Sequence, residues 1–241
     1  MKQNTLFLSG AVLAVTTSLL TGCASGTQLS TTRTFDVILT DLTNSADNSG
    51  QPFSPPVFVT HNSNVKLWDV NGIASLGVQN IAESGNRTAQ VSALQPLVGT
   101  SVMSLVTPLS SPLLPGTSVT VRVTVDAAHP YLSHVWMLGR TNDGFGGQNA
   151  VDIFNQEGTK TYNILGLDAG TENNSEKRGF LGSLGGGNAR DPENGLIRLH
   201  EGITGRGDAP ASWNWSSGAI PANQNPVARV TITPVDVPTG S

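Results

Sequence analysis

The residues best suited to chemistry lie in two short segments that combine glycine with acidic side chains. The first is NDGFGG at 142–147 and the second is LDAGTE at 167–172. They place the carboxylates of Asp143, Asp168 and Glu172, with several backbone carbonyls, in what the sequence predicts to be two loops. Ca²⁺ takes roughly six to eight oxygen ligands of this kind, and glycine lets carbonyls turn inward without a side-chain clash. The pattern therefore favours a calcium site, with the amides of Asn142 and Asn149 as further candidate ligands.

Two other interpretations of the same acidic residues stay open. Asp143-Gly144 can be a plain turn and Asp168 a loop cap, because aspartate often fills both roles. Alternatively, a secreted envelope hydrolase could use the same loops, with a pair of carboxylates on either side of a substrate cleft. The four-residue spacing of Asp168 and Glu172 lets both side chains reach one ion across a compact turn, which supports the metal interpretation.

The sequence carries no local signature of a catalytic site. Its histidines form no His-x-x-x-His or His-Glu-x-x-His pair, the chain has a single cysteine, and no Gly-x-Ser-x-Gly segment is present. We therefore expect a protein that is not an enzyme. His61, His200 and Asp208 fall in otherwise motif-like segments and are kept as a candidate secondary polar site.

The tripeptide Arg206-Gly207-Asp208 matches the sequence that integrins recognise. Matches of this length arise often by chance, so a turn-forming or loop-bracing role is the better interpretation of Asp208. The segment WNW at 213–215 could stack on a sugar ring, although tryptophan more often serves as a packing residue. We assign it no function.

The elements that would position these residues are mainly strands. Residues 119–125 read VTVRVTV, with valine on one face and Thr120, Arg122 and Thr124 on the other, which is the pattern of a half-buried antiparallel strand. Pro115-Gly116 predicts a turn just before it. Similar β-branched or aromatic content predicts further strands at 34–39, 57–60, 131–138, 159–165 and 227–235.

One helix is expected at 75–84. Ser75 can cap its start, Val78, Ile81 and Ala82 share a face, and Gly85 can end it. The glycine-rich stretch 179–195 lacks an apolar period and predicts a long loop. The fold class is therefore all-β: an antiparallel β-sandwich with one short helix and long loops.

The N-terminus has the features of an export signal. A short basic start, an apolar run at 6–20 and small residues before Cys23 are typical of a lipoprotein signal peptide covering 1–22. We expect Cys23 to be lipidated, 23–33 to form a tether, 34–236 to form one domain and 237–241 to form a tail. Ala24 and Ser25 follow the cysteine in place of an aspartate, which favours an outer-membrane location in the bacterial cell envelope.

The composition excludes one class of partner. Charged residues make up 12% of the chain against roughly 25% in typical soluble domains, and the formal net charge is −4. A nucleic-acid-binding protein normally shows a clustered basic surface, and no basic tract is present. We therefore expect no nucleic-acid partner.

The order of motifs along the chain resembles the N-terminal spondin domain of F-spondin and mindin, and most closely its bacterial single-domain relatives. The similarity extends from about residue 34 to 235, and several motifs in the same order are more specific than any one alone. They are FSPPV at 53–57, TH at 60–61, LW at 67–68, GIASLGV at 72–78, IAESG at 81–85, NDGF at 142–145, LDAGTE at 167–172, HEG at 200–202, GRGD at 205–208 and NPVARV at 225–230.

This resemblance implies a β-sandwich similar to calcium-dependent membrane-binding domains, with a metal site in loops at one end. Asp143 matches the aspartate of the first metal loop, and Asp168 and Glu172 match the acidic positions of the second. The animal relatives commonly carry glutamate where this chain has Leu76, so that acidic residue is missing here. The implied function is a lipid-anchored extracytoplasmic binding or adhesion module that carries Ca²⁺ and binds an extracellular protein or glycan.

Overall fold

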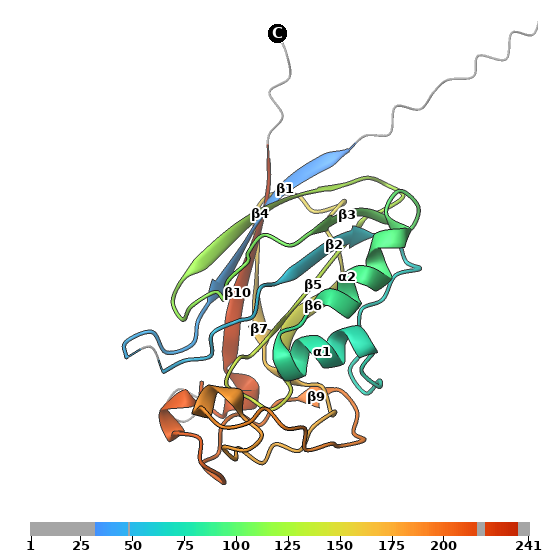
Figure 1. Ribbon diagram of the computed structural model, residues 1–241. Coiled ribbons are helices and arrows are strands. Elements are labelled where there is room, and N and C mark those ends of the chain that lie inside the picture. The colour runs from blue at the N-terminus through green and yellow to red at the C-terminus, as the bar shows by residue number, and fades with distance from the viewer. Residues whose placement is uncertain (1–31, 48, 216–219, 236–241) are drawn as a thin grey trace, which may run out of the picture.

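The structure is a computed structural model that describes residues 32–47, 49–215 and 220–235. These residues form two antiparallel sheets that face each other and a pair of helices on the outer face of the second sheet (Figure 1). The expected β-sandwich is therefore confirmed. No helix within the described ranges is long and apolar enough to span a bilayer.

The first sheet has four strands in the order β4-β1-β10-β7. Its strands are β1 (Arg33–Asp41), β4 (Ser118–Val125), β7 (Lys160–Leu165) and β10 (Pro226–Pro234). The second sheet has six strands in the order β3-β2-β5-β6-β8-β9. Its strands are β2 (Val57–His61), β3 (Val102–Val106), β5 (Tyr131–Met137), β6 (Gly144–Asp152), β8 (Leu167–Asp168) and β9 (Arg198–Leu199).

Strand β4 shows why the two-residue period correctly predicted a half-buried strand. Its residues Val121, Val123 and Val125 are buried in the core between the sheets. On its other face, Arg122 donates two hydrogen bonds, of 2.8 and 2.9 Å, to the carboxylate of Asp36 on the neighbouring strand β1. One face is thus apolar and the other is exposed to solvent, as the alternation predicted.

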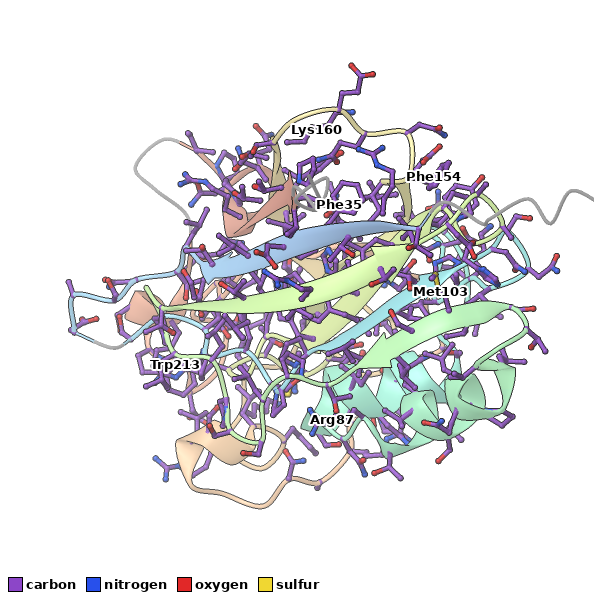
Figure 2. The ribbon with its side chains drawn as sticks, turned by 90° about the horizontal axis from the view of Figure 1, so that it is seen from above. Phe35, Arg87, Met103, Phe154, Lys160 and Trp213 are labelled. Carbon is purple, nitrogen blue, oxygen red and sulfur yellow. The ribbon has the colours of Figure 1, made fainter. Side chains whose placement is uncertain are left out.

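Strands β2 and β5 lie between two cores and are buried on both faces. In β2, Phe58 belongs to the core between the sheets, whereas Val57 and Val59 belong to a second core beneath the helices. Seen from above, β1 and β4 form one layer, β2 and β3 the next, and the helices lie on the far side (Figure 2). The six-stranded sheet is therefore held from both sides.

The expected helix is present as α1 (Leu76–Ser84). The Ser75 hydroxyl accepts the Val78 N–H at 3.3 Å, and Gly85 ends the helix with φ 68°. A second helix, α2 (Thr88–Leu94), follows it and was not expected, because it is short and has no side-chain cap. Short 3-10 turns are η1 (Gln95–Leu97), η2 (Gly182–Leu184), η3 (Ala211–Trp213) and η4 (Ala222–Gln224).

The glycines of the first acidic segment do not form the predicted loop, because they begin strand β6. A Cβ on Gly146 would lie 2.7 Å from the Trp136 ring, and a Cβ on Gly147 would lie 2.1 Å from the His134 carbonyl oxygen. Glycine is thus required for close pairing of β5 and β6, and it does not serve to turn carbonyls toward an ion. Only Asn142 and Asp143 of this segment precede the strand.

Opposite ends of the sandwich hold the start of the domain and the acidic residues. Arg33, the first residue of β1, donates hydrogen bonds to the carbonyls of Phe154 and Gln156, which follow β6, whereas Asp143 precedes β6. A strand of 9 residues spans roughly 30 Å. Figure 1 shows the start of β1 and the end of β10 at one end, and β9 at the other.

The first strand of the described residues starts at Arg33. The predicted signal peptide 1–22, Cys23, nearly all of the tether 23–33 and the tail 237–241 lie outside the described residues. The 179–195 segment is mainly loop, as expected, although Leu181 is buried with Ile203 and Ala209 in a small third core.

The requirement for glycine at position 147 can be tested by substitution. We expect Gly147→Ala to lower the free energy of unfolding by roughly 2–4 kcal/mol, because the added methyl group would force β5 and β6 apart. Urea denaturation measures the change. Gly179→Ala is the control, since nothing lies within 4 Å of its added Cβ, and it should stay within about 0.5 kcal/mol. Equal effects of the two substitutions would contradict the packing explanation.

Candidate functional site

Asp143 is the residue around which the acidic end is organised. It is fully buried, and its Oδ2 accepts the backbone N–H groups of Thr171 at 2.7 Å and Glu172 at 3.0 Å. Its carbonyl oxygen accepts the Ala169 N–H at 3.1 Å. Its second carboxylate oxygen, Oδ1, is buried without a hydrogen-bond partner in the described residues. Asp143 therefore joins the two acidic segments and leaves one anionic oxygen unsatisfied.

Asp168 lies at the end of β8, opposite Gly144 of β6. Its Oδ1 accepts the Gly170 N–H at 2.7 Å. Its Oδ2 accepts the side-chain amide of Asn174 at 2.7 Å and lies 3.0 Å from Nη2 of Arg198 on β9. This carboxylate is thus buried and fully engaged by protein donors.

Glu172 is buried in the segment after β8 and meets an acidic residue of helix α1. Arg190 donates two hydrogen bonds, of 2.8 and 2.7 Å, to Glu83, and its Nε lies 3.9 Å from Oε1 of Glu172. The sequence did not predict a role for Glu83, although it stands in the IAESG segment, because the resemblance pointed to an acidic position only at the helix start, at Leu76. Leu76 is exposed, so helix α1 supplies its acidic group from the opposite end.

Negative charge at this end is only partly compensated. Burial, and then the neighbouring Asp168, raise the pKa of Asp143 to about 7. Burial, and then Glu83, raise the pKa of Glu172 to about 7. Burial also raises the pKa of Asp168, although Arg198 opposes that change. The arrangement favours binding of either protons or a cation.

The donor chemistry suits a hard cation, because it consists of carboxylates and carbonyls with one buried anionic oxygen free. However, no three acidic, histidine or cysteine side chains in the described part of the chain converge to hold an ion as they stand. Asp168 faces Arg198, and Oδ2 of Asp143 is engaged by backbone N–H groups. A cation at this end would have to be held through Asp143 Oδ1 with movement of the arginines.

A pocket of about 260 Å³ opens beside the acidic residues. It lies between the loop before helix α1, represented by Ile73, and the paired segments around Thr171 and Glu193, with Arg190 at its wall. The backbone of Thr171 accepts the Glu193 N–H at 2.9 Å, which fixes that wall. The pocket thus adjoins the acidic end through Thr171 and Arg190, while the side chains of Asp143, Asp168 and Glu172 are buried behind it.

The amide candidates for metal binding hold the protein backbone in the structure. The Asn149 side chain accepts the Leu67 N–H at 3.1 Å and donates to the Trp68 carbonyl at 2.7 Å. Asn142 accepts the Glu176 N–H at 3.3 Å. Asn149 braces the loop before helix α1, and only Asn142 lies next to Asp143.

The structure does not bring His61, His200 and Asp208 together in one polar site. His61 on β2 contacts the Ser133 hydroxyl at 2.7 Å, while His200 follows β9 and packs at a tilt against Trp215, with ring centroids 5.2 Å apart. Strands β5, β6 and β8 separate β2 from β9, which corresponds to roughly 19 Å. Burial lowers the pKa of His61 and lowers that of His200 to about 4, so both rings are neutral core residues.

The Arg206-Gly207-Asp208 segment is fixed by Glu176. The Glu176 carboxylate accepts the backbone N–H groups of Thr204, Gly205 and Arg206. A Cβ on Gly207 would lie 2.4 Å from the Glu176 carbonyl oxygen, and Asp208 accepts the N–H of Arg178 at 2.8 Å. Asp208 therefore braces a loop, as expected. Of the two tryptophans nearby, Trp215 is buried and Trp213 covers Arg140.

Comparison with known protein families identifies the family of this chain. The family model described as Spondin_N matches residues 45–177, just over half of the chain, and this range includes helix α1 and both acidic segments. No curated protein sequence matches the chain significantly.

The raised pKa of Asp143 can be tested by the pH dependence of stability. Because the folded state holds the proton more tightly than the unfolded state, Asp143 stabilises the fold at low pH and loses this effect as pH rises toward 7. We expect Asp143→Asn to gain stability relative to the unmodified protein between about pH 5 and pH 8, by roughly 1–4 kcal/mol. Urea denaturation in the presence of a chelator measures this difference.

Asp36→Asn provides the matched control. Arg122 lowers the pKa of Asp36, so this group is ionised in both states across the same pH range and its effect should not change with pH. The buried histidines titrate in all variants and cancel in the comparison. Parallel profiles for Asp143→Asn and the unmodified protein would show that Asp143 keeps an ordinary pKa.

Proposed function

The chain belongs to the Spondin_N family, and on this basis we propose that it is an extracytoplasmic binding module anchored to the bacterial envelope through lipidated Cys23. The family supports a binding or adhesion role outside the cell. The partner we propose is an extracellular protein or glycan.

The observation that carries this proposal is the separation of the two ends of the sandwich. The described chain begins at one end, where Arg33 binds the carbonyls after β6, and the acidic residues lie at the other end of β6. An anchor attached before β1 would therefore hold the acidic end away from the membrane. Such an arrangement suits a module that presents a binding surface outward, on the outer membrane of the envelope.

We propose further that the acidic end binds Ca²⁺ through Asp143, Asp168 and Glu172, with Glu83 as an additional acidic neighbour. A bound cation would supply positive charge where burial has raised the pKa of Asp143 and Glu172. It would also take up the unsatisfied Oδ1 of Asp143. Arg198 and Arg190 supply part of this compensation through Asp168 and Glu83.

A hydrolase that uses the same acidic residues has less support. A general acid, base or nucleophile must come within hydrogen-bonding reach of its substrate. Asp143 and Asp168 are 0% and 1% exposed, and protein donors hold both carboxylate oxygens of Asp168 and one carboxylate oxygen of Asp143. Turnover of esters, glycans or phosphates by the purified protein would favour this alternative.

The calcium site is tested by calorimetric titration of the full-length chain in a detergent solution. We expect saturable binding of Ca²⁺ and a free energy of unfolding that rises by about 1.4 kcal/mol at tenfold Kd. Glu172→Gln removes one charge at nearly constant shape, and it should weaken binding at least tenfold.

Glu157→Gln is the control for that titration, because Glu157 is exposed in the turn after β6, at the end opposite Asp143. It should bind Ca²⁺ like the unmodified protein. Absence of heat and of stabilisation in the unmodified protein would remove the calcium proposal while leaving the anchored binding module intact.

The lipid anchor is tested by metabolic labelling with an alkyne-tagged fatty acid in the bacterial host. We expect the unmodified chain to incorporate the label and to fractionate with the outer membrane, because the segment before Cys23 is typical of a lipoprotein signal. Cys23→Ser should lose the label and leave the membrane fraction. Equal labelling of both proteins would exclude Cys23 as the attachment point.

A further inference from the structure

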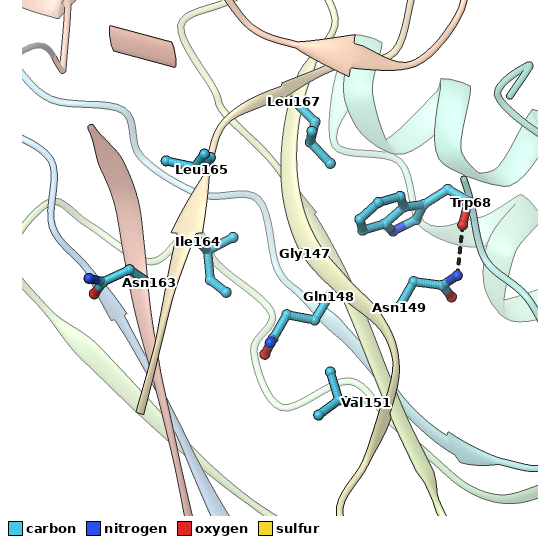
Figure 3. A pocket seen from close by; sticks show the side chains of 9 residues that line it. All are labelled: Trp68, Gly147, Gln148, Asn149, Val151, Asn163, Ile164, Leu165 and Leu167. Atoms are coloured by element: carbon cyan, nitrogen blue, oxygen red, sulfur yellow. Dashed lines mark hydrogen bonds between the residues drawn. The ribbon is translucent and has the colours of Figure 1, made fainter. Parts of the chain in front are cut away.

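A second candidate binding site lies on the flank of the sandwich, where the two sheets separate. Strands β6 and β7 follow each other in the chain, yet β6 belongs to the six-stranded sheet and β7 to the edge of the four-stranded sheet. The seam between them holds a pocket of about 290 Å³, close to the lower limit of roughly 300 Å³ for small-molecule sites (Figure 3). Its volume suits one or two small rings.

The wall on the β6 side is an indole ring. Trp68 is half-buried and packs edge-on against Phe145, with ring centroids 5.6 Å apart and an interplanar angle of 79°. Asn149 holds the same residue through a 2.7 Å hydrogen bond to its carbonyl, drawn in Figure 3. The ring is therefore positioned before any ligand arrives, which lowers the entropy lost on binding.

One unpaired amide group, that of Gln148, points from β6 into the seam (Figure 3). Oε1 of Gln148 faces Nε2 of His134 at 3.0 Å, so the Gln148 NH₂ group has no partner in the described residues. The side chain of Asn163 on β7 is exposed and points away from Trp68 in Figure 3, so it lies on the outer face of that strand. Nε1 of Trp68 is buried without an acceptor in the same part of the chain, an arrangement that is unfavourable unless an acceptor reaches it.

The remaining lining is aliphatic, from Val151, Ile164, Leu165 and Leu167, and no charged side chain lines the pocket. A phosphate or carboxylate ligand would find no cation to pair with. A purely apolar ligand would leave the Gln148 amide without a partner and would lie in an open groove. Neither class fits the combination of a ring, an amide and short aliphatic groups.

We propose that this pocket binds a neutral saccharide. A hexopyranose has one face of C–H groups, which can stack on the Trp68 ring, and a rim of hydroxyls, which can accept hydrogen bonds from the free NH₂ group of Gln148. The proposal extends the binding function given above by naming a ligand class, and it uses none of the acidic residues. Loss of the calcium site would leave it unaffected.

The test is a titration of the full-length chain, in a detergent without a sugar head group and with a chelator present. The probes are methyl glycosides of glucose, galactose, mannose and N-acetylglucosamine, followed by ligand-observed NMR at millimolar concentration. We expect at least one glycoside to bind. Gln148→Glu keeps the acceptor for His134 and removes the NH₂ donor, so it should weaken binding by roughly 2- to 13-fold, the range for loss of one neutral hydrogen bond.

Matched variants separate the pocket from general effects on the fold. Thr161 lies on the exposed outer face of β7 and does not line the pocket, so Thr161→Ala should bind like the unmodified chain. Trp68→Phe keeps a smaller ring and should weaken binding, whereas Trp68→Ala should abolish it. Binding of no glycoside, or binding that persists in both Gln148→Glu and Trp68→Ala, would overturn the proposal.

Discussion

At the acidic end, one oxygen of Asp143 accepts the N–H groups of Thr171 and Glu172 and so ties the start of β6 to the segment after β8. These bonds position the other charged residues of the acidic end. Glu172 follows directly, and the Thr171 carbonyl binds the segment that carries Arg190 and Arg198. Such charge-assisted bonds are stronger than neutral ones, and they offset part of the unfavourable burial of the carboxylate.

The bonds of Asp143 can act only because β6 is held in a rigid sheet. The six-stranded sheet is covered by the first sheet on one face and by helices α1 and α2 on the other. Its glycines at 146 and 147 bring β6 close to the Trp136 ring and the His134 carbonyl. A strand fixed on both faces presents Asp143 and, further along, Gln148 at defined positions, as a pre-organised binding surface requires.

The sequence predicts those strands and helices whose signals come from residues close together in the chain. Strand β4 could be predicted from its alternating valines because one of its faces is buried and the other is exposed to solvent. Helix α1 could be predicted because its capping residues, Ser75 and Gly85, are adjacent to it in the sequence. The start of strand β6 was predicted as a loop because its glycines are required by the close approach of Trp136 and His134. Both of these residues lie on another strand.

The acidic site shows the same division between local and distant signals. Asp143, Asp168 and Glu172 were found by residue type and spacing, and the structure places them in adjoining segments. Glu83 and the arginines were missed because their proximity depends on the packing of α1 and on a distant loop. His61 and His200 were considered together because of sequence motifs, yet the order of strands keeps them apart.

The arginines at this end also bear on how tightly a cation could bind. Arg198 pairs with Asp168, and Arg190 lies between Glu83 and Glu172, so an incoming ion would compete with guanidinium groups that already supply positive charge. Displacing them leaves charges that must be solvated or paired elsewhere, which lowers the net gain from metal binding. Calcium sites in extracellular modules work at roughly 10⁻⁴–10⁻³ M, and a site with built-in counterions belongs in that range. For the calcium site that we propose, weak affinity would follow from the same charges that pair the arginines, as in a module that works outside the cell.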